Sequence, residues 1–409
     1  MNGFYDLTPC PNKCSRFTGA VMDWGAPSTS QITDEIIADN TFRSYQNQPL
    51  GEWMNHKLAG LYSRDPESIN FETIANSIEY LNTFFSSKYR PAFSEFKNLM
   101  PAFFTERDDL MEILWFDRIY PSKNNEWYVE GREQGKISWN DYDYFFAKIY
   151  RYYINKVVSI VEKYTKQLGE HKDLNGQLDK FLKSLKEPIR CYTTNYDRFI
   201  PLVSKLPFFE GFTENSHNEL QFDPTTVLNH NRVNCWYNLH GSVHFNKGGI
   251  NYLNYEKEKF IRNFGIGSGS VEDNDQDSRR LLQSNLITGY NKSSRILLDP
   301  YSQFYHRFYA DCLEAKKIYV IGYSFTDFHL NRALRTALTI NEDVTIEIIS
   351  YHKYSQLFKE WQSLDQLEGN MHNIQLLNSL FGRVATSDTA DRINIWFQGF
   401  KKFLENYTS

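Results

Sequence analysis

The order of apolar and polar positions predicts short strands that alternate with helices in the second half of the chain. The strand-like runs are rich in β-branched and aromatic residues and end in polar residues. They lie at 188–192, 233–239, 317–321 and 344–350. Helix-like runs lie at 198–206, 304–315, 328–338 and 390–404. Strands separated by helices are typical of a parallel sheet, so the expected fold class is α/β with a Rossmann-like, doubly wound parallel sheet.

Residues 71–186 have a helical pattern instead, with apolar residues recurring every three or four positions. One stripe comprises Ile74, Ile78, Leu81, Phe84 and Phe85, and a second comprises Tyr142, Phe146, Ile149, Tyr153, Val157, Ile160 and Tyr164. A further amphipathic run, 174–185, ends before Pro188. Such aromatic stripes are typical of a helical core or an oligomer contact. We therefore expect a large inserted helical subdomain at 61–185 within a Rossmann-like core formed by 1–60 and 186–409.

Two polar stretches follow neither period. Residues 214–231 are polar, and irregular structure is expected there. Residues 265–277 are rich in glycine, serine and acidic residues, which is typical of a mobile surface loop.

Length, composition and charge narrow the class of protein. The 409 residues exceed the usual size of one domain, and a hydrophobic content of 41% allows a sizeable core. A net charge of −5 gives no general attraction to nucleic acid or to an anionic membrane, so no direct contact with either is expected. No apolar run is long enough to span a bilayer, no secretory signal is visible, and the 5 cysteines make no disulfide framework. The expected location is the cytoplasm.

Polar residues and glycines gather where three of the expected strands end. Thr194, Asn195 and Asp197 follow the first strand, His240 begins a His-Gly-Ser turn after the second, and 322–327 follows the third. Open parallel sheets bind their ligands outside the carboxyl ends of the strands. The three segments are therefore expected to form one nucleotide site.

A further glycine-bearing segment lies near the N-terminus. It runs from Gly19 and Ala20 to Gly25 and Pro27, ahead of a helix-like run at 31–38. Glycine permits close approach of the backbone, and the start of a helix behind such a loop suits a pyrophosphate. An ordinary turn before a capped helix has the same pattern, and both interpretations stay open.

Together these segments resemble the silent-information-regulator, or sirtuin-like, family. Its members have a Gly-Ala-Gly loop ending in Gly-Ile-Pro, then Gln-Asn-x-Asp, His-Gly and Gly-Thr-Ser. The approximations here, in the same order and over about half of the chain, are Gly25-Ala26-Pro27, Thr194-Asn195-Tyr196-Asp197, Leu239-His240-Gly241-Ser242 and Gly322-Tyr323-Ser324-Phe325-Thr326-Asp327. The likeness is closest to the bacterial branch that degrades NAD+ in anti-phage defence.

Two departures from the family pattern matter. Protein deacetylases of the family carry a zinc ribbon of two Cys-x2-Cys pairs after the His-Gly segment, whereas only Cys312 lies beyond Cys235 here. This absence favours the NAD+ hydrolase branch. The first loop is also irregular: the usual Gly-Ala-Gly-x-Ser falls on 17–21, or alternatively on 13–15 with an insertion after it, so pyrophosphate binding by residues 10–27 stays open.

The resemblance implies an NAD+ glycohydrolase that releases nicotinamide and ADP-ribose. Asn195 would orient the nicotinamide ribose or the attacking water, and Asp197 would support the nicotinamide end or the loop. His240 would hydrogen-bond the ribose hydroxyls and act as a base, as a largely neutral imidazole can. Nicotinamide leaves a pyridinium as a neutral molecule, so the strong general acid of glycoside hydrolysis is not needed, and fixed dipoles in the site suffice.

The remaining contacts to NAD, the substrate, would come from loop residues. The expected set is Gly19, Ala20, Gly25, Pro27, Thr194, Gly322, Ser324 and Asp327. Within it, Gly322 and Ser324 would contact the adenosine ribose, and the start of the helix near Asp327 would lie on the phosphate side.

Each candidate residue also has a structural interpretation. Asn195 is typical of turns, and Asp197 or Ser324 could cap the helix that follows it. Cys10 and Cys14 form a lone Cys-x3-Cys without the second pair that a zinc site needs, and His240 with His244 has strand rather than helix spacing. No metal is therefore predicted.

Other functions stay open. The chain could be an NAD-dependent deacylase, an ADP-ribosyl transferase, or a non-enzymatic sensor or scaffold that binds NAD or ADP-ribose. An enzyme that empties the NAD+ pool must be restrained, so we expect a homo-oligomer assembled through the aromatic helices or a separately encoded partner. Relatives of this kind act with a HerA-type ATPase, which we favour, with Argonaute-like proteins or with a phage trigger protein.

Overall fold

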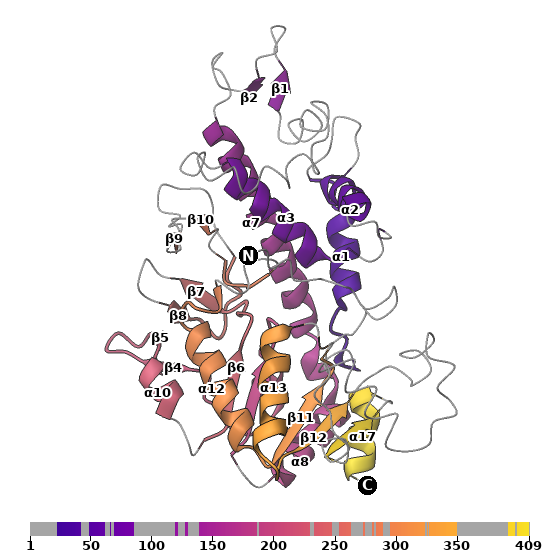
Figure 1. Ribbon diagram of the computed structural model, residues 1–409, viewed down its shortest axis with the longest axis vertical. Helices are drawn as coiled ribbons and strands as arrows, with labels where there is room; N and C mark the ends of the chain where they lie inside the picture. The colour runs from indigo at the N-terminus through magenta and orange to yellow at the C-terminus, as the bar shows by residue number, and fades with distance from the viewer. Residues whose placement is uncertain are drawn as a thin grey trace, which may run out of the picture. The chain divides into compact units, whose positions relative to one another are not determined.

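Helices and short parallel strands alternate along the second half of the chain, which makes this an α/β protein (Figure 1). The computed structural model describes residues 23–41, 49–61, 66, 69–85, 119–121, 127–129, 139–185, 188–229, 233–247, 253–262, 273–274, 280–281, 284–288, 295–323, 325, 327–349, 392–396 and 399–408. All structural statements below refer to these residues.

The chain divides into two compact units, each assembled from separate stretches. Unit 1 comprises Met1–Ser28, Lys163–His240 and Leu298–Ser409, and unit 2 comprises Thr29–Glu162 and Gly241–Leu297. This division differs from the single insertion expected at 61–185. Residues 29–60 and 241–297 group with the helical unit, and 163–185 group with the strands. Sequence periodicity reports which face of an element is buried, but not which neighbour buries it.

A three-stranded parallel sheet forms one core of unit 1. Its strands are β11 (Lys317–Ile321), β12 (Thr345–Ile349) and β13 (Ile393–Trp396), in that order. On one face the helix α13 (Phe328–Ile340) packs through a core that includes Val320, Ile346, Ile348, Ile393, Leu334 and Ala337, and α12 (Tyr301–Glu314) lies beside α13. Alternate strand residues point to the opposite face, as the period of two requires.

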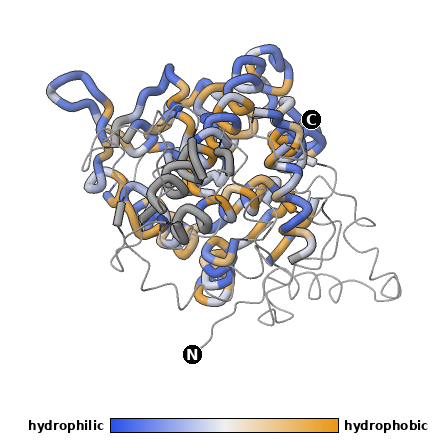
Figure 2. Tube along the Cα trace, turned by 90° about the horizontal axis from the view of Figure 1, so that it is seen from above, coloured by the Kyte–Doolittle hydropathy of each residue, from blue (hydrophilic) through white to orange (hydrophobic). Residues whose placement is uncertain are grey.

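The opposite face of this sheet is covered by α8 (Lys172–Ser184) and α17 (Gly399–Thr408). Phe181 of α8 packs edge-on against Tyr319 of β11 at 5.3 Å and against Phe403 of α17 at 5.5 Å between ring centroids. Hydrophobic and hydrophilic residues alternate along α17 near the C-terminus (Figure 2). In this helix Phe403 is buried while Lys402 is exposed. The sheet is thus enclosed between helices on both faces.

A second parallel pair joins β3 (Arg190–Thr193) to β6 (Cys235–Asn238). In this register Thr193 lies opposite Asn238, so both strands end at the same level. The helix α12 covers this pair as well, because Phe304 stacks on Tyr237 at 4.8 Å between centroids. One helix therefore packs on both parallel sheets of unit 1.

Three expectations for unit 1 need correction. A helix was expected at 390–404, but 393–396 forms β13 and α17 begins only at Gly399. Burial alternates along Ile393-Asn-Ile-Trp, with the two isoleucines more buried than Asn394 and Trp396, and pairing with β12 selects the strand. The stretch 214–231, expected to be irregular, contributes to the β4 (Phe212–Glu214) to β5 (Leu220–Phe222) hairpin and holds α10 (Pro224–Asn229). The helix expected at 198–206 is reduced to α9 (Phe199–Val203).

The other elements expected in unit 1 form close to their predicted bounds. The predicted helices 174–185, 304–315 and 328–338 correspond to α8, α12 and α13, and a short 3-10 helix, η5 (Leu168–Glu170), precedes α8. The strands β11 and β12 match the runs at 317–321 and 344–350. Strong periodicity at these positions is reinforced by burial on two faces, which is why local pattern and tertiary structure agree.

Unit 2 is mainly helical. Its elements are α1 (Thr29–Ile37), α2 (Leu50–Leu61), α3 (Phe71–Phe85), α7 (Trp139–Thr165, which ends in unit 1) and the hairpins β1 (Ile119–Pro121) to β2 (Trp127–Val129), β7 (Phe245–Lys247) to β8 (Leu253–Tyr255) and β9 (Asp273–Asn274) to β10 (Arg280–Leu281). The β1–β2 hairpin lies in a stretch that was expected to be helical throughout. The members of the two apolar stripes whose side chains are described are buried, as predicted: Ile74, Ile78, Ile149, Tyr153, Val157, Ile160 and Tyr164. None of the helices in the described ranges has the length and apolarity needed to cross a bilayer.

Candidate functional site

The loop that follows β3 turns sharply and is tied to the neighbouring strand. The Asn195 amide donates to Thr193 Oγ1 at 3.0 Å, which closes a local turn. The Asn238 side chain, at the end of β6, donates to the carbonyl oxygens of Asn195 at 3.0 Å and of Asp197 at 2.8 Å. The position of Asn195 is therefore set by the strand that leads to His240.

Asp197 holds this loop from inside unit 1. It is 3% exposed, its Oδ1 accepts from the Phe199 amide at 2.7 Å, and its Oδ2 accepts from the Tyr164 hydroxyl. Burial raises the pKa of Asp197, and the hydrogen bonds from Tyr164 and the Phe199 amide offset part of this effect. Beside it, Arg198 forms a buried bidentate ion pair with Glu210 at 2.7 Å. Both Asp197 oxygens thus accept bonds that anchor the loop. The N-cap of α9 is Arg198, which makes no side-chain cap bond, so Asp197 lies one residue before the cap position expected for it.

His240 lies just beyond the end of β6. The preceding amide, of Leu239, donates to the Thr193 carbonyl at 2.8 Å, so the parallel pairing continues up to the histidine. Because Thr193 is opposite Asn238, Asn195 and His240 stand at the same offset past their strands. The imidazole is 4% exposed. The residue after it, Gly241, has a φ of +89°, which favours glycine.

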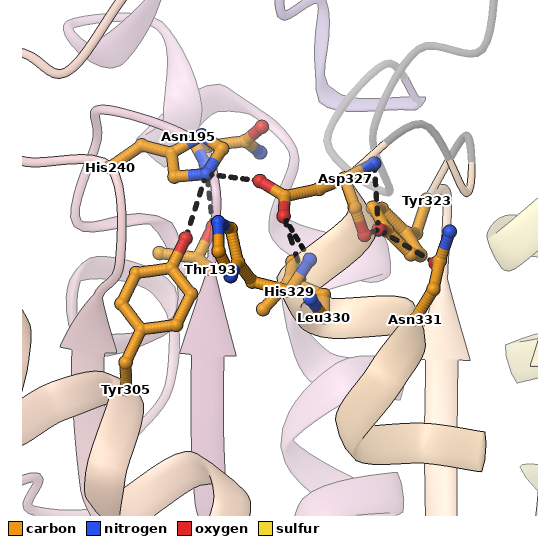
Figure 3. Close-up of polar contacts among 9 residues, drawn as sticks. All are labelled: Thr193, Asn195, His240, Tyr305, Tyr323, Asp327, His329, Leu330 and Asn331. Carbon is orange, nitrogen blue, oxygen red and sulfur yellow. Dashed lines mark hydrogen bonds and ion pairs between the residues drawn. The ribbon is translucent and has the colours of Figure 1, made fainter. Parts of the chain in front are cut away.

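The His240 Nε2 atom contacts two side chains from other elements of unit 1. It lies 3.0 Å from Asp327 Oδ2 and 3.1 Å from the Tyr305 hydroxyl oxygen (Figure 3). A carboxylate accepts only, whereas a hydroxyl can donate or accept. A hydrogen bond to an ionised carboxylate is roughly twice as strong as a neutral one, so Asp327 favours the tautomer with hydrogen on Nε2. Nδ1 is then the ring nitrogen that can accept a proton.

Asp327 is held in place by the helix that it begins. Its Oδ1 accepts from the amides of His329 at 3.0 Å and Leu330 at 3.4 Å, which makes it the N-cap of α13. The two oxygens therefore have separate partners: one caps the helix, and the other faces the imidazole.

The role expected for Asp327 changes with this geometry. The helix start was expected to face phosphate, but Asp327 itself accepts from the His329 and Leu330 amides of that first turn. A carboxylate at this point suits the hydroxyls of a ribose better than a phosphate, because it accepts hydrogen bonds and repels anions. Tyr305 was not among the predicted residues, since a tyrosine in an amphipathic helix has no local signal.

The remaining predicted residues are placed as follows. Gly322 has a φ of +59° and its amide donates to the Ile349 carbonyl at 2.9 Å, so it turns the chain beside the end of β12. Thr194 is half-buried in the turn after β3. Gly19, Ala20 and Ser324 lie outside the described residues.

The N-terminal segment is anchored by a tryptophan. Trp24 is fully buried, packs edge-on against Phe199 at 4.7 Å between centroids, and donates through Nε1 to Asn175 Oδ1 at 2.6 Å. Gly25 follows with a φ of +80°, and Pro27 is half-buried. The predicted glycine loop thus ends beside α9. Trp24, which was not among the predicted site residues, holds it there.

No group of three or more His, Cys, Asp or Glu residues within the described ranges could hold a metal ion. Cys10 and Cys14 lie outside those ranges, so the absence of a metal stays a prediction. Cys191 and Cys312 are unpaired, and burial raises the pKa of each thiol to about 12, which keeps them protonated at neutral pH. In unit 2, the His244 Nδ1 atom donates to the Lys259 carbonyl at 2.7 Å.

The chain matches no model of a known protein family, and none of the curated proteins matches it.

Proposed function

We propose that unit 1 binds NAD+ at the carboxyl ends of β3, β6 and β11 and hydrolyses it to nicotinamide and ADP-ribose. The observation that carries the proposal is the 3.0 Å contact between His240 Nε2 and Asp327 Oδ2, which joins the segment after β6 to the segment after β11. The Asn238 bonds to the loop after β3 add the third strand end. Ligands of parallel sheets bind at such ends, and we propose a Rossmann-like, doubly wound core on this basis.

In this mechanism Asp327 orients the imidazole and His240 acts as the base. Water attacks the anomeric carbon of the nicotinamide ribose while the bond to the pyridinium nitrogen breaks. The bonding electron pair goes to that nitrogen, nicotinamide leaves as a neutral molecule, and the proton of the water goes to His240 Nδ1. The Asn195 amide supplies a fixed dipole that orients the ribose or the water. Asp197 acts only by positioning the Asn195 loop.

Product analysis of NAD+ incubated with the full chain tests the proposal. We expect nicotinamide and ADP-ribose in equal amounts, and we expect His240→Ala and Asn195→Ala each to abolish their release. The matched controls are His217→Ala and Asn229→Ala, exposed residues on the β4–β5 hairpin and α10 that should leave the rate unchanged. Parent-like hydrolysis by both site variants would overturn the assignment.

Restraint of the activity is part of the same proposal. The incubation is therefore run with the chain alone, at concentrations that favour a homo-oligomer, and with a separately encoded partner, a HerA-type ATPase first and an Argonaute-like or phage trigger protein second. Measurable NAD+ binding with intact NAD+ under all of these conditions would favour a sensor or scaffold. Formation of O-acetyl-ADP-ribose from an acetyl-lysine peptide would instead indicate a deacylase, and ADP-ribose attached to protein a transferase.

A further inference from the structure

The segment between β11 and α13 has an unusual backbone. Gly322 and Phe325 both have a positive φ, of +59° and +56°. Glycine adopts this conformation at no steric cost, whereas phenylalanine does not, so its surroundings must hold Phe325 in place. Backbone outliers that the surrounding structure over-determines gather at functional sites, and this one lies two residues before Asp327.

Two side chains hold the segment. Asn331, one turn into α13, donates from Nδ2 to the Phe325 carbonyl at 2.7 Å, and its Oδ1 lies 3.0 Å from the Tyr323 hydroxyl. The same hydroxyl accepts from the Asp327 amide at 3.1 Å and lies 2.9 Å from the Asp327 carbonyl (Figure 3). Burial and the Asp327 charge raise the pKa of Tyr323, so the hydroxyl stays protonated. The two side chains, which we call the Tyr323–Asn331 latch, bond to each other, and their other bonds end on the backbone of Phe325 and Asp327.

We propose that Tyr323 and Asn331 are positioning residues that aim the Asp327 carboxylate at His240 and so select the Nε2–H tautomer. Asp327 caps α13 and also accepts from His240 Nε2. Both interactions require one fixed backbone conformation at Asp327. The N-cap bonds alone fix the carboxylate relative to α13. The latch also fixes the segment that precedes α13, because it joins this helix to the backbone at Phe325 and at Asp327. Asn331 is 9% exposed, and its bonds to Tyr323 and Phe325 connect it to the segment that carries Asp327.

The test is the tautomeric state of His240, read from imidazole ¹⁵N resonances of the histidine-labelled full chain and assigned with His240→Gln. The parent should show hydrogen on Nε2, and Asn331→Ala and Tyr323→Phe should shift the resonances toward a mixture of tautomers. The matched control is Asn341→Ala, at the other end of α13, where the side chain donates to the Leu313 and Ala315 carbonyls at 3.0 and 2.9 Å. It should weaken the helix without moving the His240 signals.

For the rate, the inference rests on the proposed function: Asn331→Ala should lower kcat for NAD+ hydrolysis about ten-fold or more with little change in KM, and should alter the pH profile. The two readouts separate the failures. A parent chain that leaves NAD+ intact overturns the proposed function, while the resonances still test the latch. Unchanged His240 resonances in folded Asn331→Ala and Tyr323→Phe overturn the latch, whatever the parent does to NAD+.

Discussion

The loops after β3 and β11 have the same local design. Each leaves a parallel strand, turns through polar residues and carries an aspartate whose Oδ1 accepts from a backbone amide in the first turn of the next helix. Asp197 Oδ1 accepts from the Phe199 amide at 2.7 Å, and Asp327 Oδ1 accepts from the His329 amide at 3.0 Å. An aspartate just before a helical run is expected to accept a bond from an amide of the first turn, and the sequence has one in each loop.

The second oxygen separates the two loops. Asp197 Oδ2 accepts from the Tyr164 hydroxyl, which arrives from the end of α7, whereas Asp327 Oδ2 lies 3.0 Å from the His240 imidazole. Burial raises the pKa of Tyr164, so its hydroxyl stays protonated and only anchors the carboxylate, whereas an imidazole can exchange protons near neutral pH. The Asp197 carboxylate is therefore structural, and the Asp327 carboxylate can also support a base. Identical local chemistry acquires a different role from its tertiary partner.

The largest expected effect is on the catalytic rate, which should distinguish Asp327 from Asp197. In Asp327→Asn the new amide can donate to His240 Nε2, which moves the ring hydrogen to Nδ1 and removes the base. We expect kcat for NAD+ hydrolysis to fall about 10³-fold, or about 4 kcal/mol. Asp197→Asn should change kcat by less than about ten-fold, because an amide oxygen still accepts from the Phe199 amide. Initial rates of nicotinamide release check both, and equal losses would contradict the distinction.

Local stability should show the opposite order. Asp197→Ala removes the acceptor of the Phe199 amide and leaves the buried Tyr164 hydroxyl without its acceptor, so we expect a loss of about 2–4 kcal/mol. Asp327→Ala should cost about 1 kcal/mol, the usual value of a cap, because the Tyr305 hydroxyl 3.1 Å from His240 Nε2 remains as an acceptor for the imidazole. Amide hydrogen exchange over 194–203 and 327–333 measures both as free energies of opening. A larger loss in the free energy of opening at α13 than at α9 would contradict this expected order.

The pH dependence of stability should distinguish the Asp197 loop as well. The folded-state pKa of Asp197 is raised by burial, so its protonated form favours the folded state. Its contribution is complete below the unfolded pKa of about 4 and is lost as pH rises through the higher folded value. As pH rises through this window, the parent loses this contribution and Asp197→Asn does not. The unfolding midpoint of the variant should therefore rise relative to that of the parent. A constant difference between the two would show that Asp197 does not titrate there.

The smallest effect concerns the two tyrosines. Tyr305→Phe removes the hydroxyl 3.1 Å from His240 Nε2 but keeps the Asp327 contact, so we expect kcat to change roughly five-fold, or about 1 kcal/mol. Tyr164→Phe removes the corresponding hydroxyl at Asp197 and should leave kcat within about two-fold while it weakens the loop. A loss in Tyr305→Phe as large as in Asp327→Asn would mean that the hydroxyl, and not the carboxylate, orients the imidazole.

Much of unit 1 could be predicted because its signals are local. Apolar runs of strand length located β11 and β12, and helical periodicity located α8, α12 and α13. Polar residues at strand ends indicated Asn195 and His240, which parallel pairing does bring to the same level. β13 was missed because a four-residue alternation is weaker than the surrounding helical pattern until β12 pairs with it. The contact of Tyr305 and the anchor at Trp24 depend on residues that are distant in sequence.

The sequence by itself determined where strands end, where helices can begin and which aspartates can cap them, because these properties depend on neighbours within a few positions. Only the tertiary structure decided which side chain meets the second oxygen of each aspartate. That choice depends on strand register and helix packing across more than 30 residues for Tyr164 and Asp197 and more than 80 for His240 and Asp327. No local pattern encodes such a contact, yet it separates a structural carboxylate from one that can hold a catalytic base.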